Sequence, residues 1–138
     1  MTKHGRSRSD PDFPVLGPDD FFPFPDPESA DEWGVVCSGG NLSPGLLLSA
    51  YRQGIFPWFS EDEPLLWWSP DPRFVLFPPK LHVSKTMRKI MRRSGFELAL
   101  DRNFEAVIRA CSGVPRKGQK GTWITDDMIA AYCGLHGL

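Results

Sequence analysis

Four stretches of the chain place hydrophobic residues three and four positions apart, which is the spacing of one face of an α-helix. The first is predicted over about residues 44–53, because Ser43 and Pro44 suit a helix start and Gly54 suits a stop. The other three are expected over residues 85–93, over residues 104–111, and after Thr125. Their apolar, inward faces consist of Met87, Ile90 and Met91 in the second helix, Phe104, Val107, Ile108 and Cys111 in the third, and Met128, Ile129, Tyr132 and Leu135 in the fourth.

Three short apolar runs are bounded by prolines or turn residues and predict strands, at residues 65–68, 74–77 and 96–100. Residues 55–59 are apolar too, but Pro57 prevents them from extending the first helix, so we expect an aromatic loop there. The sequence contains no internal repeat. Helices and short strands mixed along one chain indicate an α+β fold.

Residues 1–32 are predicted to form a flexible, acidic, proline-rich arm. From Asp10 to Glu32 there are eight acidic side chains, six prolines and no base, a composition that favours extended backbone over helix. Four phenylalanines in this stretch would gain by lying on an apolar surface. We therefore expect a disordered tip, residues 1–10, and then a segment that docks on the rest of the protein.

The chain has 138 residues, enough for one domain, and no run of about 18 apolar residues that would span a membrane. Its N-terminus lacks an apolar secretory signal, and three cysteines suit reduced thiols, so we expect a cytoplasmic protein. The 16 Lys and Arg nearly balance the 17 Asp and Glu. However, residues 1–72 hold 4 basic and 12 acidic residues, whereas residues 73–138 hold 12 basic and 5 acidic ones. A charged partner is therefore expected on the second half.

Aromatic residues are concentrated in one part of the chain, where no standard hydrolase, metal-protease or phosphate-loop motif is present. Trp67 and Trp68 are neighbours on a predicted strand and face opposite ways, so at least one of them is expected in the core. Trp58 differs because it lies in a proline-containing loop, where a rigid ring suits a nucleotide base or an apolar side chain. A stacked base contributes about 1–3 kcal/mol.

Residues 80–95 carry six basic side chains and no acidic one. A face of one sign suggests phosphate binding, although a solubilising surface explains the same composition equally well. Together with the aromatic residues, this basic stretch favours the end of an RNA molecule as the ligand.

Five motifs follow one another through residues 33–138. They are GGNLSP at residues 39–44, AYRQGIFPWFS at 50–60, LWWSPDPR at 66–73, LHVS at 81–84 and GTWIT at 121–125. With these motifs in this order and spacing, the chain resembles the leucyl/phenylalanyl-tRNA-protein transferases. These are bacterial enzymes that move Leu or Phe from aminoacyl-tRNA to the N-terminus of a protein.

The resemblance implies a set of partners and a mechanism. The donors would be Leu-tRNA and Phe-tRNA, with Met used less well, and the acceptors would be proteins with N-terminal Arg or Lys, which are thereby marked for degradation. No metal, coenzyme, DNA or membrane partner is implied. The reaction would be aminolysis of the aminoacyl ester by the acceptor's free amine, with the tRNA 3' ribose as leaving group.

The resemblance also implies site residues and a domain organisation. The aminoacyl-adenosine end would lie near Tyr51, Trp58, Trp123 and Tyr132, and the tRNA acceptor stem would meet a basic helix containing Lys85, Arg88, Lys89, Arg92 and Arg93. A small N-terminal domain, residues 33–72, would be followed over residues 73–138 by the first strands and helices of an acetyltransferase-like (GNAT-type) domain.

The chain departs from the family pattern in two respects. Asn41 stands where the family usually has Asp, a change expected to weaken a local cap or charge pair. Family members also continue beyond the segment matching residue 138, and that continuation holds the proposed proton-relay residues, so no catalytic residue is assigned. We expect a truncated transferase that is inactive unless the remaining part is supplied by another chain. A non-catalytic tRNA-binding remnant and an inactive fragment are the alternatives.

Overall fold

The computed structural model describes residues 10–60, 63–93, 95, 97–115 and 122–138. It forms two compact units, one made of Met1–Asp71 together with Asn103–Leu138 and the other of Pro72–Arg102. The α+β prediction is confirmed, because the described residues contain helices and one small sheet. The acetyltransferase-like character and the domain boundaries at residues 32 and 72 stay predictions.

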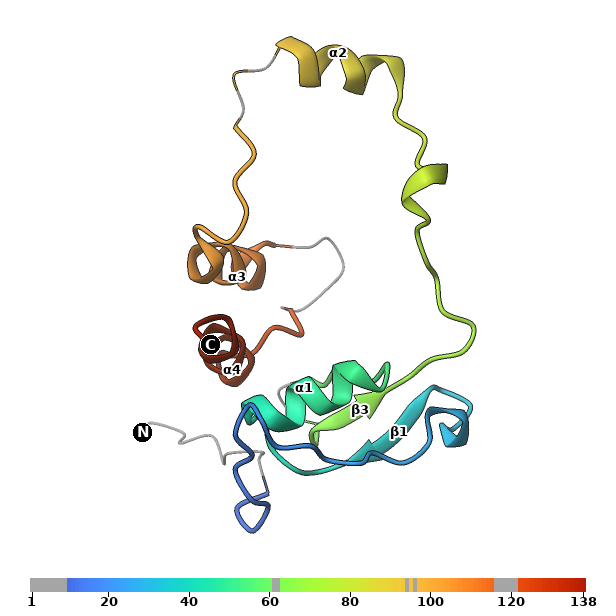
Figure 1. Ribbon diagram of the computed structural model, residues 1–138, viewed down its shortest axis with the longest axis vertical. Helices are drawn as coiled ribbons and strands as arrows, with labels where there is room; N and C mark the ends of the chain where they lie inside the picture. The colour runs from blue at the N-terminus through green and yellow to red at the C-terminus, as the bar shows by residue number, and fades with distance from the viewer. Residues whose placement is uncertain (1–9, 61–62, 94, 96, 116–121) are drawn as a thin grey trace. The chain divides into compact units, whose positions relative to one another are not determined.

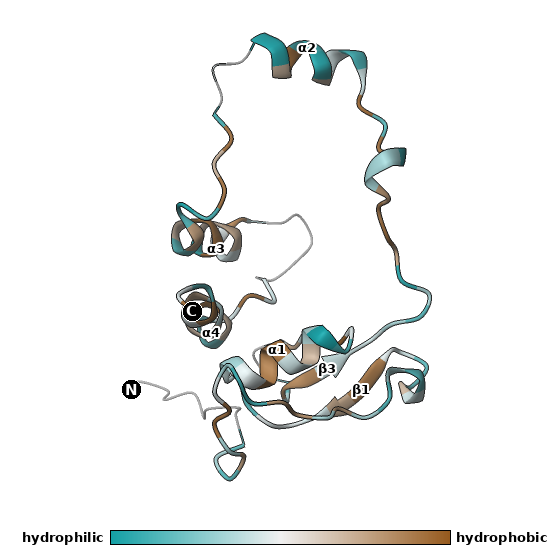
Figure 2. Ribbon diagram, in the orientation of Figure 1, coloured by the Kyte–Doolittle hydropathy of each residue, from teal (hydrophilic) through white to brown (hydrophobic). Residues whose placement is uncertain are grey.

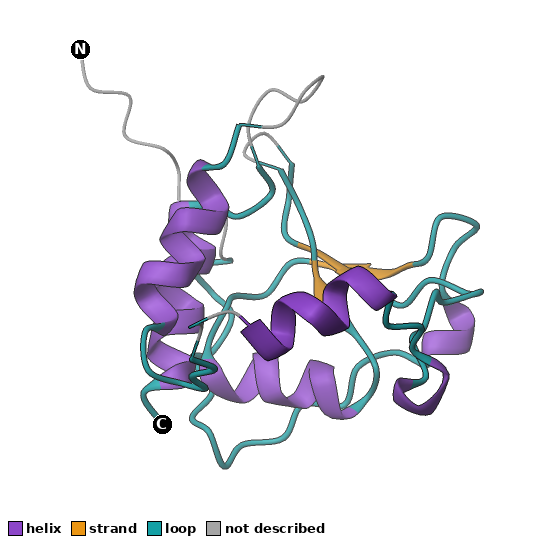
Figure 3. Ribbon diagram, turned by 90° about the horizontal axis from the view of Figure 1, so that it is seen from above, coloured by secondary structure: helices purple, strands orange, loops and turns teal. Residues whose placement is uncertain are grey.

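A three-stranded antiparallel sheet lies at the centre of the first unit, with strand order β1-β3-β2 (Figure 3). Its strands are β1 (Val35–Ser38), β2 (Phe56–Pro57) and β3 (Leu66–Trp68). The predicted strand at residues 65–68 is therefore confirmed. The other two strands were not predicted, and β2 occupies part of the expected aromatic loop. Both are short, and each exists because it pairs with β3.

Helix α1 (Pro44–Arg52) packs on one face of the sheet and contributes three buried residues to the core (Figure 1). Leu46, Leu47 and Ala50 are buried against Trp67 of β3. Helix α4 (Asp126–His136) adds Met128 to the same core, and helix α3 (Phe104–Gly113) packs on α4. Brown segments in Figure 2 mark apolar residues of α1 and β1. Three of the four predicted helices thus belong to the first unit.

Local capping explains why α4 begins where it was predicted to begin. The Thr125 hydroxyl accepts a hydrogen bond from the backbone N–H of Met128, which satisfies one of the free donors of the first turn. Acidic residues Asp126 and Asp127 follow in that turn, where the helix dipole favours negative charge. At the other end of the helix, the ring of His136 stacks on Phe104 of α3 with centroids 4.6 Å apart.

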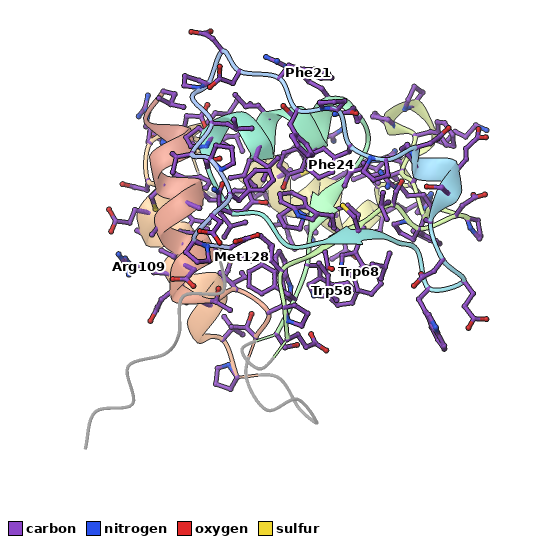
Figure 4. The ribbon with its side chains drawn as sticks, turned by 90° about the horizontal axis from the view of Figure 1, so that it is seen from below. Phe21, Phe24, Trp58, Trp68, Arg109 and Met128 are labelled. Atoms are coloured by element: carbon purple, nitrogen blue, oxygen red, sulfur yellow. The ribbon has the colours of Figure 1, made fainter. Side chains whose placement is uncertain are left out.

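The proline-rich segment docks on α1, as expected from its phenylalanines. Apart from a 3-10 helix at Pro27–Ser29, this segment has no helix, and N–H groups of its extended part bond to side chains at or beside α1 instead. The N–H of Leu16 donates to Ser43 Oγ at 3.1 Å, that of Phe22 to Ser49 Oγ at 2.9 Å, and that of Phe24 to Gln53 Oε1 at 3.1 Å. Figure 4 shows Phe24 turned toward the interior and Phe21 on the outside. Residues 1–9 of the expected disordered tip lie outside the described residues.

Asn41 takes part in this docking, and the expectation that it weakens a local cap or charge pair stays a prediction. Its Oδ1 accepts from the N–H of Ser43 at 3.0 Å, so the cap-like bond is present. Its Nδ2 donates to the carbonyl oxygens of Phe13 and Pro14 at 3.2 and 3.1 Å. An aspartate could accept the first bond but could not donate the other two. The amide therefore ties the docked segment to the start of α1.

Gly45 offers a direct test of the docking. A Cβ at this position would collide with the carbonyl oxygen of Gly17 and lie 2.8 Å from Leu16 Cβ. Gly45→Ala should therefore lower the free energy of unfolding by about 1–3 kcal/mol, measured by chemical denaturation, because overpacking outweighs the better helix propensity. The matched control is Gly134→Ala in α4, where a Cβ meets nothing within 4 Å, and a gain of about 0.5–1 kcal/mol is expected. Equal effects of both changes would contradict close docking.

The second unit, Pro72–Arg102, corrects two sequence predictions. Helix α2 (Lys85–Arg93) forms as predicted, and Ser84 Oγ accepts from the N–H of Met87 at its start. The expected strands at 74–77 and 96–100 are wrong for the residues described there, which have no regular structure. An apolar run becomes a strand only when a neighbouring strand completes its backbone hydrogen bonds, and in the described part of the chain none pairs with these runs.

The predicted inward face of α2 is exposed, and that of α3 is exposed at Val107 and Cys111 and half-buried at Phe104 and Ile108. No residue of either helix is buried, and the exposed fractions of Met87, Ile90 and Met91 lie between 47% and 67%. By contrast, the face of α4 is buried at Met128 and Ile129, as predicted. All three cysteines are free thiols. Within the described ranges, no helix is long and apolar enough to cross a membrane.

Candidate functional site

Two adjacent tryptophans of β3 lie on opposite faces of the sheet. Trp67 points toward α1, is 1% exposed, and donates from Nε1 to the carbonyl oxygen of Gly39 at 3.0 Å. Trp68 lies on the opposite face and is half-buried. The prediction that at least one of the pair belongs to the core is confirmed for Trp67.

The open face of the sheet carries Trp58, which immediately follows β2. Its backbone N–H donates to the carbonyl oxygen of Leu66 at 3.1 Å, so it continues the ladder with β3. Its neighbours Pro57 and Phe59 are both buried, whereas the Trp58 side chain is 47% exposed. Its ring lies 5.2 Å from that of Trp68, at an interplanar angle of 53° (Figure 4). We call Trp58 and Trp68 the indole pair.

Tyr51 and Tyr132 come together from helices α1 and α4. Their hydroxyl groups share a hydrogen bond across a sequence separation of 81 residues, and their rings meet edge to face with centroids 6.5 Å apart. Tyr51 is 48% exposed, whereas Tyr132 is half-buried. The two phenols thus form a polar contact at the surface between the two helices.

Burial raises the pKa of Tyr132 above its ordinary value near 10, and the hydrogen bond with Tyr51 and that phenol's charge raise it further. A raised pKa favours the neutral phenol in the folded state, so its contribution to stability is complete below the unfolded-state pKa. Above about pH 10 the unfolded chain ionises first, and stability falls by up to about 1.4 kcal/mol per pH unit.

Tyr132→Phe should therefore flatten the loss of unfolding free energy between pH 9 and 11, measured by denaturation at several pH values. Tyr51→Phe is the control, because it leaves the buried Tyr132 in place and should retain most of the slope. Identical alkaline slopes for wild type and Tyr132→Phe would contradict a raised pKa at this residue.

The structure brings the four predicted aromatic residues together only in part. Tyr51 contacts Tyr132, and Trp58 contacts Trp68, which was not among the predicted site residues. Trp123 lies just before the Thr125 cap and is 42% exposed. Alternation along the strand could have separated Trp68 from the core residue Trp67, but only the pairing of β2 with β3 places Trp68 on the same face as Trp58.

Helix α2 carries its five cations on one side. At 100° per residue, Lys85, Arg88, Lys89 and Arg92 fall on one face with Arg93 beside them, opposite Met87, Ile90 and Met91. Every residue of this helix is exposed, and it contains no acidic residue. The helix is teal in Figure 2 except at its apolar residues. Such a face attracts closely spaced phosphates.

A cavity of about 370 Å³ lies elsewhere in the first unit, between the docked segment and α4. Its lining includes Phe13, Asn41, Phe59 and Asp127, but none of the predicted site residues. Tyr51, Trp58 and Trp123 are each between 42% and 48% exposed, so part of each ring is open to a ligand. Among the residues that the structure describes, no three His, Cys, Asp or Glu side chains are grouped to hold a metal ion.

Comparison with known families gives two adjoining matches. Residues 40–71 match the family described as the leucyl/phenylalanyl-tRNA protein transferase N-terminal domain, and residues 75–138 match the family described as leucyl/phenylalanyl-tRNA protein transferase. The first match contains Tyr51, Trp58 and the β3 tryptophans. The second contains α2, Trp123 and Tyr132.

Curated relatives agree with these matches. The chain is 58% identical over 113 residues to a leucyl/phenylalanyl-tRNA–protein transferase of Myxococcus xanthus and 56% identical over 115 residues to one of Syntrophus aciditrophicus. These alignments cover 82% and 83% of the chain, and each covers 48% of the relative. A protein of the same name from Paraburkholderia xenovorans is 48% identical over 132 residues, covering 89% of the chain and 53% of the relative.

The matched families and relatives are all described as tRNA–protein transferases. It belongs to the leucyl/phenylalanyl-tRNA protein transferase family. The resemblance seen in the sequence motifs is thus confirmed. The chain spans about half the length of the curated relatives it matches.

Proposed function

We propose that this chain provides the donor-binding part of an aminoacyltransferase, which moves Leu or Phe, and Met less well, from aminoacyl-tRNA to proteins with N-terminal Arg or Lys. The modified proteins would then enter degradation in the cytoplasm. The observation that carries the proposal is the half-exposed Trp58 ring, held on the open face of the sheet between two buried residues. A ring fixed in this way offers a flat surface for the terminal adenine.

Two further features suit a charged tRNA. The hydroxyl-bonded Tyr51 and Tyr132 provide polar atoms beside aromatic surface, which suits the ribose and ester of the aminoacyl end. The five exposed cations of α2 suit the phosphates of an acceptor stem, and their contribution should decrease as salt rises. The two surfaces belong to different compact units, so each is proposed to bind its own part of the donor.

The chemistry that follows from this proposal requires little from acid–base groups. The free amine of the acceptor attacks the carbonyl carbon of the aminoacyl ester, an amide bond forms, and the ribose 3' oxygen leaves with the proton that the amine gives up. The ester is already activated. Holding donor and acceptor in register could therefore supply a large part of the acceleration, on the order of 7–11 kcal/mol at best.

An apolar aminoacyl group would be selected chiefly by contact with aromatic and aliphatic surface. Such selection distinguishes side chains weakly when they differ by one or two methylene groups. Related apolar amino acids should therefore be accepted in part.

The test measures binding and transfer separately with the purified chain. Labelled Phe-tRNA is offered with a peptide that begins with Arg, and the matched control is the same peptide with an acetylated N-terminus, which has no free amine. Transfer to the free peptide alone supports the aminoacyltransferase. Salt-sensitive binding of Phe-tRNA without transfer is expected both of a donor-binding part and of the alternative, a non-catalytic tRNA-binding remnant. Transfer that appears when the part of a relative that this chain does not span is added as a second chain supports the donor-binding part, and continued absence of transfer supports the remnant. Neither binding nor transfer would refute the proposed function.

A further inference from the structure

Trp68 contacts Trp58 at two independent points. Its indole Nε1–H donates to the backbone carbonyl oxygen of Trp58, and its ring packs against the Trp58 ring at 5.2 Å. Together with the bond from Trp58 N–H to Leu66, these contacts hold the residue through its donor, its acceptor and its side chain. Trp68 therefore contacts both the backbone and the ring of Trp58.

Sheet register explains why Trp68 is placed to do this. Phe56 of β2 pairs with Trp68, and strand alternation puts Phe56, Trp58 and Trp68 on the same face. The neighbouring Trp67 uses its own indole N–H on Gly39 and packs into the core instead. Two residues of identical chemistry thus have separate tasks, and only one of them touches the candidate site.

The indole of Trp68 has one donor and no acceptor, and that donor is already used. Trp68 therefore has no hydrogen bond to offer a ligand, and both its N–H and its ring are engaged with Trp58. When an exposed aromatic side chain must become ordered on binding, the lost side-chain entropy lowers the affinity for the ligand. A ring that is already fixed does not incur this entropy cost.

We propose that Trp68 is a positioning residue that fixes the ring of Trp58 in the orientation that receives the aminoacyl-adenosine end. This inference rests on the proposed function, because it assigns Trp58 a role in donor binding. Trp68 would contribute to affinity by fixing the Trp58 ring in the unliganded protein.

The experiment compares Trp68→Phe with Trp67→Phe. Both changes remove an indole N–H that bonds to a backbone carbonyl, but only the first removes contacts with Trp58. The probe is the phenylalanyl amide of 3'-amino-3'-deoxyadenosine, in which a stable amide replaces the ester. Affinities are compared per folded molecule. Trp68→Phe should weaken binding about 3- to 10-fold, and Trp67→Phe should leave the affinity unchanged even if it lowers stability.

A second measurement reports the environment of the Trp58 ring in the unliganded chain. With 5-fluorotryptophan incorporated, the Trp58 fluorine resonance is identified by its loss in Trp58→Phe. It should move toward the position of a solvated indole in Trp68→Phe and stay in place in Trp67→Phe. Binding by wild type with an unchanged Trp58 resonance and equal affinity in Trp68→Phe would overturn the inference alone. Absence of probe binding by wild type would instead overturn the proposed donor site.

Discussion

Replacing Trp58 by alanine is expected to weaken binding of the phenylalanyl-adenosine amide by about 5- to 150-fold, because loss of one base stack costs about 1–3 kcal/mol. The fold itself should change little, since the ring is 47% exposed and lies outside the core. The measurement is an equilibrium titration, with near-ultraviolet circular dichroism to determine the folded fraction. This is the largest single-residue effect expected at the aromatic surface.

Two controls separate stacking from folding. Trp33→Ala removes another tryptophan that is 73% exposed and should leave the affinity unchanged. Trp67→Ala removes a buried ring and should lower stability strongly, by about 3–5 kcal/mol, while the remaining folded molecules bind normally. Equal losses of affinity per folded molecule in Trp58→Ala and Trp67→Ala would assign Trp58 to the core and remove it from the site.

The second large effect is expected on the basic face of α2. Reversing two charges, Arg88→Glu with Lys89→Glu, should weaken binding of Phe-tRNA about 10- to 100-fold at low salt, because two phosphate contacts become repulsions. The plot of log affinity against log salt should also become flatter, by about 1–2 in slope. Filter binding at several salt concentrations measures both quantities in one series.

Net charge alone also affects tRNA binding, so the control changes it equally. Arg102→Glu with Arg109→Glu alters two exposed arginines outside α2 and shifts the total charge by the same amount. This control should change the affinity only slightly and leave the salt slope intact. A salt slope unaffected by the α2 variant would remove this helix from the tRNA interface.

Local signals explain which parts of the fold could be predicted from the sequence. The helices were placed within one or two residues because their ends depend on nearby side chains, such as the Thr125 hydroxyl and the Ser84 hydroxyl. By contrast, β1 and β2 exist only through pairing with β3, at residues far away along the chain. Residues 74–77 show the opposite error, because an apolar run without a pairing partner was interpreted as a strand.

In the candidate site, too, local features could be predicted from the sequence and contacts between distant residues could not. The alternation of Trp67 and Trp68 is a local property, and it correctly predicted that one of them would be buried. The contact between Tyr51 and Tyr132 joins residues from two helices and follows from no spacing in the sequence, although family resemblance had named both residues. The role of Trp68 depends on the direction of one side-chain N–H bond, which no sequence pattern specifies.

The docked segment before residue 40 determines where the polypeptide can be truncated without loss of packing. The family match begins at residue 40, yet Phe13, Phe22 and Phe24 pack on the core from outside that match, and β1 also precedes it. A polypeptide that started at residue 40 would present bare aromatic-lined surface to water and leave one side of β3 without its neighbouring strand. Exposed strand edges recruit one another, so such a product should precipitate while the longer polypeptide stays in solution. The span that the N-terminal family model matches is thus narrower than the span that packs into the folded unit.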